Sequence, residues 1–336
     1  MSEETLALWR RWTELHGVEV EDLQDLQGWR RDSALRWSLR PGIEIDARNI
    51  FVGPEAKEAA HWTLRTNSRG FRTPEFAQAP ADGTLRVVTV GDSNTMGWLL
   101  DSEDAYPRRL EDHLTQMLGS AVEVVNLGLS GYTSYSCMRI LLEEALGLEP
   151  DAVVISCGAN DAQRLTSSDA AYAEQFAGPL GRLREATGQL RLVAVLRGML
   201  SGGTAERVSR VAPEAFRRNL EAMFRAVKRL EIPVVFLRVC CCPPRYGKQL
   251  AAAARRVRVP VINAPQEARA ALEQDLAVSR LRESLAEVRG WYTDELLAER
   301  PELDFMFMDK CHLNPVGADA VAEALASHLA IALRGS

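Results

Sequence analysis

The sequence predicts an α/β fold in which a parallel sheet lies between two layers of helices. From residue 85 onward, short apolar runs rich in β-branched residues alternate with amphipathic segments. This alternation is typical of a parallel sheet that is covered on both faces. In addition, 336 residues with 46% hydrophobic and 26% charged content can bury a large core and keep a solvated surface. We therefore expect a three-layer α/β/α domain.

The expected elements follow one another in strand and helix order. Pro213 stands where one helix would begin, a position that suits proline because its missing N–H would have no partner in a first turn. The Arg- and Glu-rich region 243–305 has a helical pattern and one apolar stretch, 259–262, that would add a terminal strand. The expected strands are 85–90, 122–126, 152–156, 190–196 and 234–239. The expected helices are 104–119, 134–147, 169–186, 213–230 and 315–332.

Residues 1–80 differ in character, because they hold five of the seven tryptophans and show no alternation of strands and helices. We expect an N-terminal extension here, followed by the main domain at 81–336. Leu8, Trp12 and Leu15 would share one helical face, which we expect to pack on the main core. The alternatives are that this face binds a partner or covers the site. The tryptophans of the extension are Trp9, Trp12, Trp29, Trp37 and Trp62.

The charge pattern argues against nucleic acid as a partner. The net charge of −6 comes from 46 acidic and 40 basic residues that are interspersed, so no basic stripe exists to hold a phosphate backbone. No apolar stretch reaches the roughly 18 residues of a membrane span, and the acidic start lacks the layout of a signal peptide. These features predict a soluble, cytoplasmic protein and leave its oligomeric state open.

The cysteines give no sign of a metal site. They form no CxxC pair and no Cys/His spacing typical of zinc sites. The run 240–242 follows an apolar strand, where cysteine usually acts as a small hydrophobe. We therefore expect reduced thiols. The six cysteines are Cys137, Cys157, Cys240, Cys241, Cys242 and Cys311.

Polar residues gather immediately after the expected strands, where ligands of an open parallel sheet bind. The segment 91–97 places Ser93 at the start of a turn or helix, whose free N–H groups favour developing negative charge. The segment 126–131 contains glycines that let the backbone approach a bound group closely. The segment 158–161 offers an asparagine amide, and 309–312 offers an imidazole with a carboxylate three residues before it.

Acyl transfer needs this set of groups: a hydroxyl nucleophile, an imidazole base, a carboxylate that orients the base, and donors for the oxyanion. Each motif alone is weak, but their order at consecutive strand ends makes the combination specific. Nucleotide-binding glycine loops and the Gly-x-Ser-x-Gly elbow are absent from the sequence. A metal-dependent phosphatase would need a second acid at position 94, where the chain has Asn94.

These residues resemble the sequence blocks of the SGNH hydrolases, also called GDSL-type esterases and lipases. Four blocks match, and after the serine Asn94 stands where the family often has leucine. The resemblance covers about residues 85–333, and 67–72 looks like a segment that precedes the core in some long members. The matching residues are Gly91, Asp92 and Ser93, then Asn126, Gly128 and Gly131, then Gly158, Asn160 and Asp161, and finally Asp309 and His312.

The resemblance implies a role for each central residue. Ser93 attacks the substrate, His312 is the general base, and Asp309 orients His312. The backbone amides of Ser93 and Gly131 and the side chain of Asn160 form the oxyanion hole. The resemblance also implies a flavodoxin-like, five-stranded parallel sheet and no metal or organic cofactor.

Other polar residues near the strand ends have less specific patterns. We expect Asp92 and Asp161 to accept backbone hydrogen bonds that shape their loops, rather than to act in catalysis. Arg164, Arg197 and Arg238 lie just beyond expected strands, and each could bind an anionic substrate group or remain solvated.

Together these patterns predict a serine hydrolase that cleaves an ester through an acyl-enzyme on Ser93. The expected substrate is a small molecule, a short-chain acyl or acetyl ester of a sugar or metabolite. Trp98 and Met96 would either line an acyl pocket or pack in the core. The first alternative is an acyltransferase with the same Ser-His-Asp site. The second is a non-catalytic binding module whose tryptophan-rich extension binds the partner.

Overall fold

The computed structural model describes residues 27–48, 61–177, 207–239, 242–267, 306–308 and 311–334. At its centre is a five-stranded sheet with the strand order β11-β10-β7-β5-β6, and all neighbours pair in parallel. The strands are β5 (Leu85–Gly91), β6 (Val122–Asn126), β7 (Ala152–Ser156), β10 (Val234–Leu237) and β11 (Val261–Ile262).

The strand predictions hold for the described residues. The side chains of β7 and β10 are all buried, as expected for strands covered on both faces. β10 ends at Leu237, earlier than predicted, and the apolar stretch 259–262 supplies the edge strand β11. The expected strand 190–196 lies outside the described residues.

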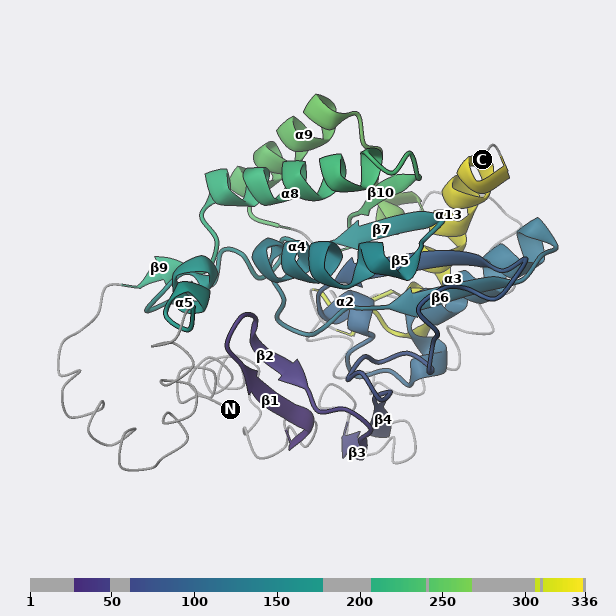
Figure 1. Ribbon diagram of the computed structural model, residues 1–336, viewed down its shortest axis with the longest axis horizontal. Helices are drawn as coiled ribbons and strands as arrows, with labels where there is room; N and C mark the ends of the chain where they lie inside the picture. Colours follow the sequence, from purple (N-terminus) through teal and green to yellow (C-terminus); the bar gives the residue numbers. More distant parts are fainter. Residues whose placement is uncertain are drawn as a thin grey trace, which may run out of the picture.

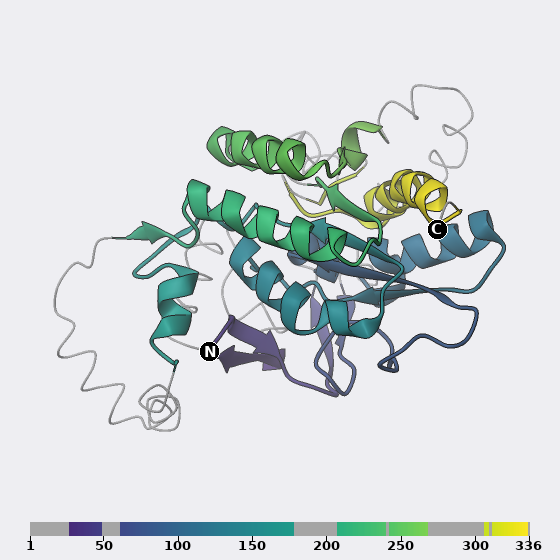
Figure 2. The ribbon, with the colours of Figure 1, turned by 45° about the horizontal axis from the view of Figure 1, so that its top comes forward.

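Helices cover both faces of the sheet (Figures 1 and 2), which confirms the three-layer α/β/α fold. Helices α4, α8 and α9 pack in a row, while α3 and α13 pack against each other. This division follows from the strand order, because right-handed crossovers that run in opposite directions place their helices on opposite faces. The helices are α3 (Tyr106–Leu118), α4 (Ser134–Glu143), α8 (Pro213–Lys228), α9 (Pro244–Val257) and α13 (Pro315–Arg334).

Two of the expected helices differ in length from the prediction. The helix expected at 134–147 ends at Glu143, and the 3-10 helix η4 (Ala145–Leu148) follows it. The helix expected at 169–186 begins as predicted but ends at Glu174 as α5 (Asp169–Glu174), and residues 178–206 lie outside the described part. Next to α5, β8 (Arg164–Leu165) pairs with β9 (Val208–Ser209).

The expectation that no apolar stretch reaches the length of a membrane span is wrong for α13, which among the described residues is the one helix long and apolar enough to cross a membrane. More than half of its apolar stretch is buried inside the protein, and it packs chiefly against α3. Its start is fixed by Asn314, whose side chain accepts a hydrogen bond from the Gly317 N–H at 2.8 Å. Packing in the core therefore accounts for the apolar character of α13.

The described part of the N-terminal extension forms two antiparallel strand pairs that are separate from the main sheet. Figure 1 shows both pairs on the side of the molecule where the short helix α2 (Ser93–Met96) lies. β2 contacts α5, and β4 contacts the 3-10 helix η3 (Ser102–Asp104). The pairs are β1 (Trp29–Asp32) with β2 (Arg36–Leu39), and β3 (Glu44–Arg48) with β4 (His61–Arg65).

The tryptophans of the extension join the main core. Trp29, Trp37 and Trp62 are at most 2% exposed and belong to the same hydrophobic cluster as the central strands. The proposed helical face of Leu8, Trp12 and Leu15, and also Trp9, lie outside the described residues. The extension is therefore packed on the α/β domain through its described part.

Replacement of Phe224 by alanine should lower the free energy of unfolding by about 3–5 kcal/mol, because it leaves a cavity between α8 and the sheet. Phe224 is fully buried, and its ring packs edge-on against Phe236 with 6.2 Å between centroids. Urea unfolding of the variant measures the loss. The matched control is Ile331→Ala on α13, where the side chain is 75% exposed and the cost should stay below about 1 kcal/mol. Equal losses in both variants would contradict the packing described.

Candidate active site

Ser93 is the first residue of α2 (Ser93–Met96), which follows β5 directly. The preceding Asp92 is the N-cap, and its carboxylate accepts a hydrogen bond from the Asn94 N–H at 3.2 Å. This contact confirms that Asp92 shapes its loop. Gly97 ends the helix with φ 73°, a left-handed conformation that favours glycine. The Ser93 hydroxyl therefore lies at the carboxyl end of the sheet, at the N-terminus of a short helix.

The loop after β6 packs directly on α2 because Gly128 has no side chain. A Cβ atom at Gly128 would lie 2.6 Å from the Cβ of Thr95 and 2.7 Å from the backbone nitrogen of Met96. The Asn126 side chain forms hydrogen bonds with both α2 and the loop. Its Nδ2 donates to the Thr95 carbonyl at 2.7 Å, and its Oδ1 accepts from the Gly128 N–H at 2.9 Å.

His312 meets Ser93 from the other end of the chain. Its Nε2 atom lies 3.0 Å from the Ser93 Oγ in a buried hydrogen bond. The turn that carries the histidine is closed by the Met308 N–H, which donates to the His312 carbonyl at 2.8 Å. The Trp98 ring packs edge-on against the imidazole, with 4.8 Å between centroids. The structure thus brings the two central residues of the sequence analysis within hydrogen-bonding distance.

Asn94 joins the serine helix to the histidine turn, a role that the sequence analysis missed. Its Oδ1 accepts a hydrogen bond from the Leu313 N–H at 3.1 Å, and its Nδ2 lies 3.7 Å from the Cys311 Sγ. Both partners flank His312 in the chain. The sequence does contain a signal for this role of Asn94. A polar side chain directly after a buried strand is expected to be buried as well, and it then needs hydrogen-bond partners.

Arg72 supports α2 from the opposite end. Its guanidinium is buried and donates to the carbonyl groups of Met96 at 3.0 Å, Gly97 and Leu100. These carbonyls lie at and beyond the end of α2, where a cation is favourable. The sequence analysis noted the segment 67–72 only as a resemblance and assigned no function to Arg72.

The loop after β7 joins the loop after β6 through two neighbouring residues. The Asn160 Nδ2 donates to the Tyr132 carbonyl at 3.1 Å. The fully buried Asp161 carboxylate accepts hydrogen bonds from the Ser134 N–H at 3.1 Å and from the Ser134 hydroxyl, which confirms its loop-shaping role. Burial raises the pKa of Asp161 to about 7, against the opposing effect of Ser134. Gly131 precedes Tyr132 in this loop and has φ 77°.

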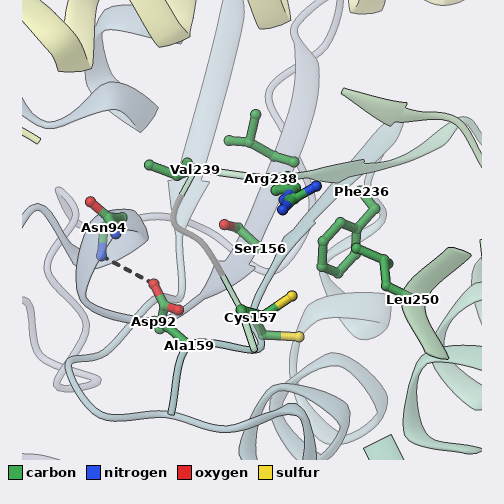
Figure 3. Close-up of a pocket in the computed structure, with 11 residues that line it drawn as sticks. Asp92, Asn94, Ser156, Cys157, Ala159, Phe236, Arg238, Val239 and Leu250 are labelled. Carbon is green, nitrogen blue, oxygen red and sulfur yellow. Dashed lines mark hydrogen bonds between the residues drawn. The ribbon is translucent and has the colours of Figure 1, made fainter. Parts of the chain in front are cut away.

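A small cavity of about 10 Å³ lies beside Asp92 at the ends of β7 and β10 (Figure 3). This volume suits roughly one water molecule. Burial raises the pKa of Asp92 to about 6, while the Asn94 N–H and the charge of His312 act in the opposite direction.

Arg238 is among the residues that line the cavity, so it lies near the site. Among the described residues, no group of three or more side chains could hold a metal ion.

The chain matches the GDSL-like Lipase/Acylhydrolase family over residues 89–320, more than half of its length. The chain belongs to this family. It is therefore a hydrolase of ester bonds. A comparison with curated proteins gives no match.

The solved structures that resemble this GDSL-type hydrolase share little sequence with it. TesA is 18% identical, with a TM-score of 0.42, over 73% of this chain and 97% of that chain. The lipase/acylhydrolase from Enterococcus faecalis is 18% identical, with a TM-score of 0.42, over 73% of this chain and 95% of that chain. The acetyl xylan esterase AlAXEase is 17% identical, with a TM-score of 0.41, over 73% of this chain and 100% of that chain.

The remaining predicted residues of the hydrolase have different outcomes in the structure. Asp309 and Arg197 lie outside the described residues. Arg164 is exposed, and its Nε donates to the Arg207 carbonyl at 3.0 Å, so it supports the β8–β9 pair. Trp98 and Met96 are both buried in the core, which favours the packing interpretation of these two side chains.

The cysteines differ in part from the expectation of reduced thiols. Cys137 and Cys157 carry free thiols, whereas Cys311 is disulfide-bonded. The expectation of reduced thiols is therefore wrong for Cys311, which directly precedes His312. A cytoplasmic location stays a prediction.

The raised pKa of Asp161 predicts a pH dependence of stability. Between the pKa of an unfolded aspartate, about 3.9, and the folded value of about 7, the folded chain binds more protons, so the free energy of unfolding falls as the pH rises. Urea unfolding measures the decrease in the free energy of unfolding between pH 4 and pH 8. This decrease should be up to about 4 kcal/mol larger in the wild type than in Asp161→Asn. Asp92 titrates in both chains and cancels in this comparison. Equal losses would show that Asp161 is ionised in the folded protein.

Proposed function

We propose that this hydrolase cleaves its ester by way of an acyl-enzyme on Ser93, with His312 as general base. The observation that carries the proposal is the 3.0 Å contact between the Ser93 Oγ and the His312 Nε2. A hydroxyl becomes nucleophilic when an adjacent base can take its proton, and this distance allows that transfer.

The proposed reaction has two steps. The Ser93 Oγ attacks the ester carbonyl carbon while its proton passes to His312, and the same proton then leaves with the alcohol as the C–O bond breaks. In the second step His312 takes a proton from water, and the water oxygen attacks the acyl carbon. The bond between this carbon and the Ser93 Oγ then breaks, His312 returns the proton to the Oγ, and the acid leaves. Asp309 would orient the imidazole and stabilise its charged form.

We propose that three donors stabilise the oxyanion: the N–H groups of Ser93 and Gly131, and the Nδ2 of Asn160. The position of Ser93 at a helix N-terminus supports this, because the first N–H groups of a helix lack partners within it. The Asn160 Nδ2 carries two hydrogens, and one of them is used by the Tyr132 carbonyl. The other is available for the substrate oxygen.

The proposed substrate is a short-chain acyl or acetyl ester of a sugar or small metabolite. Trp98 packs against His312 and the Met96 sulfur accepts a hydrogen bond from the Ser130 N–H, so neither side chain opens a channel for a long acyl chain. Arg238, beside the cavity near Asp92, remains the candidate for contact with an anionic group of the substrate. A panel of nitrophenyl esters of increasing length should show the highest kcat/KM for acetate or propionate.

Ser93→Ala should abolish both fluorophosphonate labelling and hydrolysis of nitrophenyl acetate, because the variant has no nucleophile. His312→Ala should lower kcat by a similar factor. The control is Ser327→Ala, whose hydroxyl is exposed on α13 and donates to the Glu323 carbonyl at 3.1 Å. This variant should retain the wild-type rate. Hydrolysis by Ser93→Ala at the wild-type rate, or no labelling of the wild type, would overturn the proposal and favour a binding module.

Product analysis with an added acceptor alcohol separates hydrolysis from acyl transfer. A hydrolase should release free acid at the same rate with and without the acceptor. Acylated acceptor in excess over free acid would instead identify an acyltransferase with the same residues.

Asn160→Ala should lower kcat by about 100-fold to 1,000-fold with little change in KM, because it removes a donor that acts on the transition state. Steady-state hydrolysis of nitrophenyl acetate measures the effect. Gln163→Ala is the control, since the Gln163 Nε2 donates to the Asn160 Oδ1 at 2.9 Å without being a proposed oxyanion donor. A normal kcat in Asn160→Ala would remove this residue from the oxyanion hole.

A further inference from the structure

Trp37, in strand β2 of the N-terminal extension, lies directly against Gly131. A Cβ atom on Gly131 would approach the Trp37 ring to 2.6 Å, so only glycine lets the indole lie this close. The Trp37 Nε1 donates a buried hydrogen bond to the Ser130 carbonyl at 2.9 Å. Trp37 is 1% exposed, which keeps water away from this bond.

The Ser130 carbonyl and the Gly131 N–H belong to one peptide group. In a planar trans peptide the C=O and the N–H point in opposite directions. The bond from Trp37 therefore fixes the direction of the Gly131 N–H, which points away from the indole. A hydrogen bond to the carbonyl also polarises the peptide and makes its N–H a stronger donor.

The next peptide, between Gly131 and Tyr132, is held by Arg210. The Arg210 Nη1 donates to the Gly131 carbonyl at 2.6 Å, and its guanidinium lies over the Trp37 ring at 4.8 Å from the centroid. Arg210 is fully buried and pairs with Asp169 through its Nε and Nη2 at 3.1 and 3.0 Å. Asp169 also accepts a bond from the Arg36 Nε at 2.6 Å. Arg36 immediately precedes Trp37, so the same carboxylate anchors β2 and Arg210.

We propose that Trp37 is a positioning residue of the oxyanion hole, which orients and polarises the Gly131 N–H through the Ser130 carbonyl. This inference rests on the proposed function of Gly131 as an oxyanion donor. It makes the N-terminal extension part of the catalytic unit, although Trp37 itself does not touch the substrate.

The test is Trp37→Phe, which keeps an aromatic ring in the pocket and removes the N–H. We expect kcat for nitrophenyl acetate to fall about tenfold with KM nearly unchanged, because a tenfold change corresponds to about 1.4 kcal/mol, which lies within the contribution of one hydrogen bond. Affinity for a trifluoromethyl ketone, which forms an oxyanion on Ser93, should fall by the same factor. A merely structural role would lower the melting temperature without this parallel loss.

Trp62→Phe is the matched control. Trp62 belongs to the same extension and is 2% exposed, and in the described part of the chain its indole nitrogen is buried without a hydrogen-bond partner. This variant should lower the melting temperature through the loss of buried ring volume and retain the wild-type kcat. An equal loss of kcat in both variants would overturn the inference, as would an unchanged kcat in Trp37→Phe.

If Trp37→Phe does not fold, incorporation of 3-benzothienylalanine at position 37 replaces the N–H by sulfur and keeps the ring shape. The same tenfold loss of kcat is expected, and an unchanged kcat overturns the inference. Failure of the inference and failure of the proposed function are distinguishable. In the first case Ser93→Ala is inactive while the position-37 variants are normal, and in the second Ser93→Ala retains activity.

Discussion

The close contact between α2 and the loop after β6 is the constraint on which the rest of the site depends. It exists because Gly128 leaves space for the helix, and because Asn126 bonds to both sides of the contact. With this loop fixed, Asn160 reaches it through the Tyr132 carbonyl. On the other side of α2, Asn94 holds the turn of the histidine. The parallel sheet brings these segments to one edge, and side-chain hydrogen bonds then set their spacing.

A buried group of charges is the second support of the site. Asp169 lies between Arg36 and Arg210 and also accepts a bond from the Thr133 hydroxyl at 2.7 Å. Burial works against ionisation, but the charges and hydrogen bonds of the two arginines hold the pKa of Asp169 below its ordinary value. Loss of one partner from such a group typically costs about 3–5 kcal/mol, because a charge remains buried without compensation. The group therefore couples the extension, α5 and the loop of Gly131 in a single arrangement.

The sequence predicts the sheet and its chemistry well because both have local signals. Apolar runs mark the strands, and the polar residues after them mark the edge where Ser93 and His312 meet. The two strand pairs of the extension lack such a signal, since their patterns are short and interrupted by tryptophan and arginine. Arg36 and Asp169 are 133 positions apart, and no motif links them. Arg72 and Trp37 act on backbone carbonyls, which every residue has, so no particular pairing can be derived from the sequence.

The family match begins at residue 89, whereas Arg36 and Trp37 come from β2, far upstream. A fragment cut at the homology boundary would leave Asp169 with one of its two arginines and would uncover Gly131 to solvent. Strand β2, which precedes the matched region, therefore supports the site through Arg36 and Trp37. A truncated protein that keeps Arg36 and Trp37 has to begin before β2.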